Sequence, residues 1–235
     1  MRLMYKGNKF LAVIPARGGS KGIPKKNIYP VKGKPLICYT IDEALKSHYL
    51  DKTIVSTDCS EIADIAKNNG AEIPFLRPKS LAKDDSKTIN VLLHAVNQLA
   101  KNNETFDYIV LLQPTQPLRK SWHIDNAIKQ VIECKQPNLI SVSPVDEHPI
   151  LIRSIDDEGK LQRLLPIKST IRRQDFPPYY KINGAIYINK IDRYFNENVS
   201  LNDNMYPFFM EKKYDLDIDD LYDMNRFVTI VSNLE

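Results

Sequence analysis

Short apolar runs recur along the first 144 residues of the chain and are separated by longer amphipathic segments. Runs of four to eight apolar, β-branched residues bounded by polar or proline-containing segments are typical of buried strands. Four runs fit this description, FLAVIP (10–15), TIVST (53–57), YIVLL (108–112) and LISVSP (139–144), and EIPF (72–75) predicts a shorter one.

The segments between these runs place apolar residues at helical spacing. They are PLICYTIDEALKS (35–47), EIADIAKNNG (61–70), TINVLLHAVNQLA (88–100) and SWHIDNAIKQVIEC (121–134). Strands that alternate with helices favour a parallel sheet covered on both faces. The pattern therefore predicts the doubly wound α/β class.

The alternation stops after residue 144. Residues 145–182 are rich in charge and proline and contain no strand–helix unit. A strand returns at GAIYIN (184–189), followed by FFM (208–210) and a last helix from about Asp220. We predict a single domain over residues 1–235, with 145–182 as an inserted, hairpin-like arm. In an obligate dimer such an arm contacts the partner subunit.

Charge is distributed unevenly along the chain. The net charge of +4 is small for 235 residues and gives no indication of a nucleic-acid or membrane partner. Residues 1–41 contain nine Lys or Arg and no acidic residue, whereas residues 215–223 contain five Asp. A basic start and an acidic end suit a site that holds an anion and a metal ion, or two solvated surfaces of opposite sign.

The cysteines and the apolar runs bear on the compartment. Three widely spaced cysteines, Cys38, Cys59 and Cys134, favour reduced thiols over a disulfide framework. The first nine residues are too polar for the core of a signal peptide, and no apolar run has membrane-spanning length. We therefore expect a cytoplasmic protein.

The loop ARGGSKGIPKKN (16–27) follows the first predicted strand, where ligands bind in open parallel sheets. It matches neither the Walker motif nor the dinucleotide fingerprint. Its glycines nevertheless let backbone N–H groups approach an anion, and Arg17, Lys21 and Lys26 supply positive charge. The loop predicts an anion site; the alternative is a glycine turn with solvated lysines.

Two further segments carry polar or charged side chains that suit a ligand. In QPTQPLR (113–119), the amide of Gln113 at a strand end can recognise a sugar or a base, unless the segment is only a stiff connection. Arg172 and Arg173 suit a carboxylate or phosphate, or a surface ion pair with Asp175.

The acidic segment DLDID (215–219) places alternate aspartates on one face of an extended chain. Closely spaced carboxylates repel one another unless a cation lies between them, and oxygen ligands suit Mg²⁺. The alternative is an acidic start to the last helix, which the helix dipole favours.

Together these segments resemble a known family. IPARGGSKGIPKKN, VSTD, LLQPTQPLR, RRQDFPPYYKINGAIYI and DLDID, in this order, are similar to the acylneuraminate cytidylyltransferases, also called CMP-sialic acid synthetases. The resemblance implies a Rossmann-like fold of the nucleotide-diphospho-sugar transferase type and a homodimer with a crossing arm. It also implies that CTP and a nine-carbon 2-keto acid sugar react, with Mg²⁺, to give a CMP-sugar and pyrophosphate.

The resemblance also implies roles for individual residues. The nucleotide-binding residues would be Arg17, Ser20, Lys21, Lys26, Asn27, Arg77 and Thr88, with Arg17, Lys21 and Asp217 catalytic. The residues facing the sugar would be Gln113, Arg173, Asn183, Tyr187, Phe208 and Phe209. Arg173 would pair with the sugar carboxylate, the two phenylalanines would lie near its N-acyl group, and Asp217 and Asp219 would hold the metal.

The sequence departs from the family pattern at one position. Some members carry a lysine that faces the sugar where this chain has Ile150 and Leu151 after His148-Pro149. The expected substrate is therefore N-acylneuraminate or legionaminate; the alternatives are a cytidylyltransferase for another ulosonic acid (pseudaminate or Kdo) and a non-catalytic nucleotide-binding module.

Overall fold

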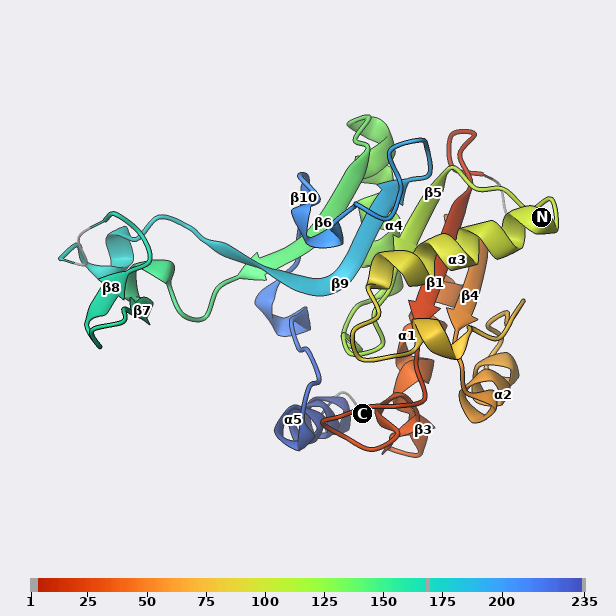
Figure 1. Ribbon diagram of the computed structural model, residues 1–235, viewed down its shortest axis with the longest axis horizontal. Coiled ribbons are helices and arrows are strands. Elements are labelled where there is room, and N and C mark those ends of the chain that lie inside the picture. The colour runs from red at the N-terminus through yellow and green to blue at the C-terminus, as the bar shows by residue number, and fades with distance from the viewer. Residues whose placement is uncertain (1–3, 168–169, 234–235) are drawn as a thin grey trace.

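A six-stranded mixed sheet forms the centre of the molecule (Figure 1) in a computed structural model that describes residues 4–167 and 170–233. The strand order is β10-β6-β9-β5-β1-β4. β1 pairs in parallel with β4 and β5, β10 pairs in parallel with β6, and β9 runs antiparallel to both neighbours. The strands span Phe10–Pro15 (β1), Lys52–Ser56 (β4), Tyr108–Leu111 (β5), Asn138–Pro144 (β6), Tyr180–Lys190 (β9) and Pro207–Phe209 (β10).

Helices cover both faces of this sheet, as the apolar pattern predicted. Phe10, Ala12 and Ile14 of β1 pack in one core cluster with α1, α2 and α4, whereas Leu11 and Val13 pack against α3 in another. Successive strand residues point to opposite faces, so one strand contributes to both layers. The helices are α1 (Leu36–Lys46), α2 (Ser60–Asn68), α3 (Thr88–Lys101), α4 (Ser121–Glu133) and α5 (Leu221–Ser232).

The strand predicted at EIPF (72–75) is wrong. Only Glu72 pairs, through an isolated parallel bridge to Ile54, and the chain then leaves the sheet. Pro74 has no backbone N–H and cannot continue the ladder. The adjacent Phe75 instead packs edge-on against His94 of α3, with ring centroids 4.8 Å apart.

The return strand is longer than predicted. β9 begins at Tyr180, inside the segment assigned to the arm, and continues to Lys190. A register shift between Ile140 and Val142 of β6 lies opposite its residues 182–187. Such a bulge bends the strand and redirects side chains. Here the bulge includes Asn183 and Gly184.

The segment between β6 and β9 extends away from the rest of the molecule (Figure 1). It contains β7 (Arg153–Ile155) and β8 (Leu161–Arg163), which pair only with each other. Large apolar side chains are exposed on it, including Ile155 (70%) and Leu161 (69%).

Short elements complete the described chain. β2 (Pro30–Val31) and β3 (Lys34–Pro35) form a small hairpin after the basic loop. Six 3₁₀ turns lie at η1 (Lys26–Ile28), η2 (Lys79–Leu81), η3 (Pro149–Leu151), η4 (Arg173–Asp175), η5 (Leu201–Asp203) and η6 (Lys212–Tyr214). The three cysteines are free thiols. In the described part of the chain, no helix combines the length and apolarity that crossing a membrane requires.

Candidate active site

The acidic segment is anchored by its apolar residues. Leu216 and Ile218 are buried in a third core cluster with Ile23, Val31 and Leu118. The backbone N–H of Ile218 donates to the carbonyl oxygen of Thr115 at 2.9 Å. Because the segment is extended, burial of residues 216 and 218 turns Asp217 and Asp219 to the opposite side, where both are exposed.

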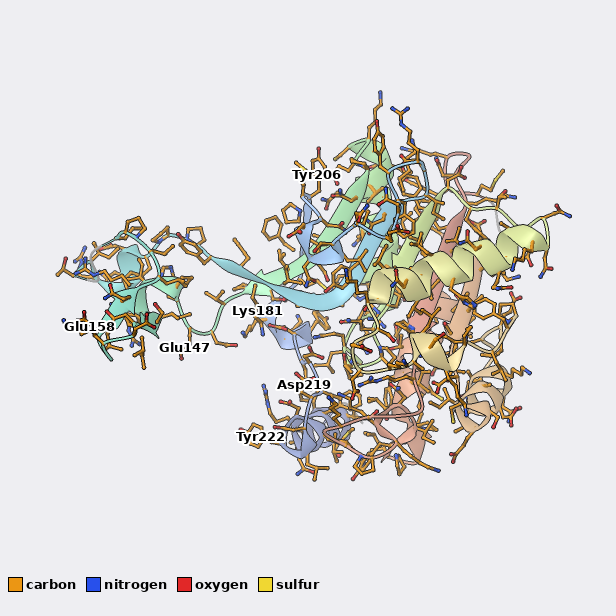
Figure 2. The ribbon with its side chains drawn as sticks, in the orientation of Figure 1. Glu147, Glu158, Lys181, Tyr206, Asp219 and Tyr222 are labelled. Atoms are coloured by element: carbon orange, nitrogen blue, oxygen red, sulfur yellow. The ribbon has the colours of Figure 1, made fainter. Side chains whose placement is uncertain are left out.

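The basic loop contacts this acidic segment directly. Lys26 donates from Nζ to the carbonyl oxygen of Ile218 at 2.7 Å and lies 3.7 Å from Oδ1 of Asp219. Figure 2 shows Asp219 close to the start of α5. A methyl group on Gly22 would lie 2.4 Å from the carbonyl oxygen of Asp219, so only glycine permits this approach.

Two side chains fix the start of the basic loop. The N–H of Gly18 donates to Oδ1 of Asp58 at 2.9 Å. Asn27, which is buried, donates from Nδ2 to the carbonyl oxygen of Arg17 at 3.0 Å. Residues 17–27 are therefore held at both ends, and Arg17 projects from a defined backbone.

Two adjoining cavities lie at the carboxyl ends of β1 and β5. The smaller, of about 240 Å³, is lined by Arg17, Ser20, Asn27 and Arg77 among others. The larger, of about 790 Å³, is lined by Asn183, Tyr187 and Asp217 among others. Thr88 and Gln113 line both cavities. The structure thus separates the residues expected to bind nucleotide from most of those expected to face the sugar, and joins the two groups at Thr88 and Gln113.

Arg77 is a buried cation at the wall of the smaller cavity. Its side chain is only 6% exposed, and its Nε and Nη2 have no hydrogen-bond partner among the described residues. Burial lowers the pKa of the guanidinium, and the nearby charge of Arg17 acts in the same direction. A buried donor without a partner is costly, so Arg77 suits an anionic or carbonyl-bearing ligand in this cavity.

A second buried arginine joins the two strands that border the larger cavity. Arg119 is 1% exposed and donates from Nη1 to the carbonyl oxygens of Ala185 at 2.8 Å and Gln113 at 3.4 Å. Burial lowers its pKa to about 9. Gly184 has φ +74°, and a methyl group there would lie 2.5 Å from Oε1 of Gln113. The position of Gln113 therefore depends on this bulge of β9.

The side-chain amide of Asn183, which lines the larger cavity, is held by hydrogen bonds within the sheet. Ser141 donates to its Oδ1 at 2.5 Å, and its Nδ2 donates to Oγ of Ser143 at 2.7 Å. The N–H of Ala185 also donates to Oδ1, at 3.1 Å. The side chain thus stabilises the bulge that shapes the cavity wall.

Tyr187 and Asp217 interact within the larger cavity. The Tyr187 hydroxyl donates to Oδ1 of Asn202 at 3.2 Å. Burial raises the pKa of this tyrosine, and the negative charge of Asp217 raises it further. The cavity wall opposite the sheet is formed by residues 197–202.

Three of the residues expected to face the sugar line neither cavity: Phe208, Arg173 and Phe209. Phe208 is buried in the core cluster of α1 and α4, because it pairs with Ser141 on that face of the sheet. Arg173 is exposed in η4 on the arm. Neither position brings the side chain to the cavities of its own chain.

Phe209 has the opposite orientation from Phe208. It is 59% exposed and packs edge-on against Tyr180, with ring centroids 4.9 Å apart. It is in register with Val142, which is in register with Ile182 of the larger cavity. Laterally paired strand residues share a face, so Phe209 continues the apolar edge of that cavity.

Asp217 and Asp219 have the chemistry of magnesium ligands. Desolvation by the surrounding protein raises the pKa of Asp217, and the charges of Asp219 and Asp223 add to this, against hydrogen bonding by Thr115 and the charge of Lys26. No group of three metal-ligating acids, histidines or cysteines occurs among residues 4–167 and 170–233. Mg²⁺ is usually held by one or two carboxylates plus substrate phosphates, so a pair suffices.

Several residues at the site carried no recognisable signal in the sequence. Asp84 forms ion pairs with both Arg17 and Lys21. Lys87 and residues 197–202 line the larger cavity. The loop containing Asp84 and Lys87 mixes charges of both signs without a motif, and residues 197–202 belong to a stretch with no periodicity.

The structure is an α/β fold in which a basic loop lies against an acidic segment beside two adjoining cavities. The chain belongs to the cytidylyltransferase family, whose profile matches residues 11–227. A CMP:2-keto-3-deoxy-manno-octonic acid synthetase solved in complex with CTP shares this fold. Its TM-score is 0.73 at 16% identity, over 97% of this chain and 100% of that one.

Curated relatives are more similar in sequence. An N-acylneuraminate cytidylyltransferase of Streptococcus agalactiae serotype V is 36% identical over 228 residues, 96% of this chain and 53% of that protein. The chain therefore spans about half the length of that relative. A CMP-N,N'-diacetyllegionaminic acid synthase of Legionella pneumophila is 40% identical over 180 residues, 77% of each chain.

Replacing Gly22 tests the contact between the basic loop and the acidic segment. We expect Gly22→Ala to lower the free energy of unfolding by about 1–3 kcal/mol, because the added methyl group overlaps backbone rather than a movable side chain. Gly19→Ala is the matched control, since nothing lies within 4 Å of a methyl group there. Urea denaturation measures both, and equal stability of the two variants would contradict the close approach.

The pH dependence of stability tests the environment of Asp217. Its raised pKa means that the folded state binds the proton more tightly, so stability falls as pH rises through the folded pKa. In chelator at pH 7, we expect Asp217→Asn to melt at a higher temperature than the wild type. The difference should vanish below about pH 4, the ordinary aspartate range.

The matched control is Asp64→Asn, on the exposed side of α2. Asp64 forms no ion pair with any residue that the structure describes, so its neutralisation should leave the melting temperature unchanged. A wild-type protein that is as stable as Asp217→Asn at pH 7 would contradict the unfavourable environment.

Proposed function

We propose that this protein transfers CMP from CTP to the anomeric hydroxyl of a nonulosonic acid, giving a CMP-sugar and pyrophosphate. The observation that carries the proposal is the pair of cavities joined at Thr88 and Gln113. Cationic residues gather at the smaller cavity, and Asp217 lies in the larger one. Two substrates bound there would meet beside the carboxylate pair.

Nucleotide binding is assigned to the smaller cavity and the basic loop. Arg17 and Lys21 would contact phosphate oxygens, because a planar guanidinium and a mobile ammonium are the usual phosphate donors. Lys26 would offset charge from its position beside Asp219. Ser20, Asn27 and Arg77 line the same cavity and would contact the remainder of CTP.

The reaction needs little covalent chemistry from the protein. The anomeric hydroxyl loses its proton to solvent as its oxygen attacks the α-phosphorus. The new P–O bond forms as the bond to the oxygen that bridges the α- and β-phosphates breaks, and pyrophosphate departs on the opposite side. Rate then comes from positioning and charge stabilisation. Gln113, fixed by Arg119 and Gly184, would orient the sugar, and Arg17 and Lys21 would stabilise charge on the leaving group.

Asp217 and Asp219 would hold Mg²⁺ together with the phosphates of CTP. When bound, the metal polarises the α-phosphate and lowers the pKa of an oxygen that it contacts. Desolvation raises the pKa of Asp217 and the charge of Asp219 raises it further; a bound cation would offset both effects, which supports this role.

The sugar is assigned to the larger cavity, as an N-acylneuraminate or legionaminate. Relatives named for these two sugars are 36% and 40% identical to the chain, so identity alone does not choose between them. Tyr187 and the apolar edge ending at Phe209 would contact the sugar and its N-acyl group. In a homodimer, the arm would bring Arg173 of a second copy toward the carboxylate, which fits the exposure of Arg173 here.

Pyrophosphate release with matched panels tests the proposal. The purified protein with Mg²⁺ is incubated with each of CTP, UTP, ATP and GTP, and with N-acetylneuraminate, legionaminate, pseudaminate and Kdo. We expect release with CTP and a nine-carbon acid only. Release with no pairing would favour a non-catalytic nucleotide-binding module, and release with Kdo alone would overturn the sugar assignment.

Alanine at either metal position tests the carboxylate pair. Asp217→Ala and Asp219→Ala should each lower kcat by ~100-fold or more, because charge stabilisation at the reacting phosphate is lost. Circular dichroism should report an unchanged fold. Asp220→Ala serves as the control, because that carboxylate caps α5 through the N–H groups of Tyr222 and Asp223 instead. Full activity of either metal-site variant would contradict the assignment.

A further inference from the structure

Asp84 bridges the two cations assigned to phosphate. Its Oδ1 lies 2.6 Å from Nη1 of Arg17, and its Oδ2 lies 2.9 Å from Nζ of Lys21. Each carboxylate oxygen therefore engages one cation. Asp84 also lines the smaller cavity together with Arg17.

A phosphate group could be bound by the same two cations in the same way. A phosphate presents two oxygens to neighbouring donors much as a carboxylate does, and guanidinium and ammonium groups bind either anion. The carboxylate uses donors that phosphate oxygens need. It also reduces the net charge of the three-group cluster from +2 to +1, which weakens the attraction for a polyanion.

The loop that carries Asp84 is held without the help of its side chain. The N–H of Lys83 donates to Oγ of Ser86 at 3.0 Å, and that hydroxyl donates to the carbonyl oxygen of Ser80 at 3.2 Å. The N–H of Ser86 donates back to the carbonyl oxygen of Lys83 at 3.2 Å. Asp84 stands at the tip of this turn and is half exposed, so its carboxylate can rotate into solvent while these bonds remain.

Arg17 likewise keeps its place without Asp84. Its carbonyl oxygen is held by Asn27, and the following N–H is held by Asp58. An orienting role for Asp84 is therefore unnecessary for this backbone, whereas the competition for donors is direct. The two cations also keep the pKa of Asp84 below its usual range, Lys21 more than Arg17, so the carboxylate is charged at neutral pH.

We propose that Asp84 sets the affinity of the triphosphate site: its carboxylate competes with phosphate oxygens for Arg17 and Lys21, weakens the binding of pyrophosphate and CTP, and so speeds product release. The inference rests on the proposed function, because it takes the basic loop as the phosphate site. It adds to the site a residue that weakens phosphate binding, beside the residues that strengthen it.

Calorimetry with inorganic pyrophosphate and Mg²⁺ on the full chain tests this role. Exposed ion pairs contribute about 0.2–1 kcal/mol each, so removing both predicts roughly twofold to thirtyfold tighter binding by Asp84→Asn. Asp85→Asn is the matched control, since Asp85 is exposed and pairs with no cation among the described residues. It should bind pyrophosphate as the wild type does, and so should Asp84→Glu, which keeps the charge.

Steady-state kinetics separates this role from a general structural one. With Asp84→Asn, KM for CTP and the inhibition constant of pyrophosphate should both fall by similar factors, while KM for the sugar acid stays constant. A structural defect would instead change all three and lower the melting temperature.

Two results would overturn the proposal. Weaker pyrophosphate binding by Asp84→Asn would mean that the carboxylate orients the cations, and unchanged binding would mean that it does not compete. A wild-type protein that does not bind pyrophosphate, or one indifferent to Arg17→Ala, would overturn the proposed phosphate site itself.

Discussion

The site depends on the burial of two side chains from the acidic segment, Leu216 and Ile218. They pack with Ile23 from the basic loop and Leu118 from the segment after β5, so three stretches far apart in the chain share one apolar cluster. Side chains alternate along an extended backbone, so the intervening aspartates must face away from the cluster. Opposite charges lie together here because apolar residues between them are buried, and electrostatic attraction alone is too weak to fix such a geometry.

Most of the framework follows from local patterns. FLAVIP predicted β1 at its observed bounds, and the helical spacing around Ile37 and Ile41 predicted α1 to within a residue at each end. Such segments can be recognised because the burial of one face or of both faces of an element imposes a pattern of apolar positions on the sequence. The segment at 72–75 was misread because a short apolar run is compatible with a strand, while the single proline that ends its pairing is a local detail.

The site was predicted unevenly, for reasons of geometry. Residues attached to strand ends, such as Arg17 and Gln113, could be placed because strand order brings those ends together. The sequence did not show which of Phe208 and Phe209 points to the side of the sheet that carries the cavity. A shift of one residue moves a side chain to the other face, and the register of β10 depends on the strand with which it pairs. Asp84 was invisible as a partner of Arg17, because an ion pair across 67 positions leaves no local trace.

β9 gives the molecule a mechanical property. One continuous strand (β9 in Figure 1) carries the base of the arm at Tyr180 and Lys181, the bulge at Gly184, and Tyr187, which lines the larger cavity. β9 pairs with β6 alone at residues 180–182 and with both β6 and β5 at residues 187–189, so it links the arm directly to the wall of the larger cavity. Lys181 also pairs with the buried carboxylate of Asp215 at 3.1 Å, two residues before Asp217. A displacement of the arm is therefore passed along β9 to the wall of this cavity, so the shape of the cavity is coupled to the position of the arm.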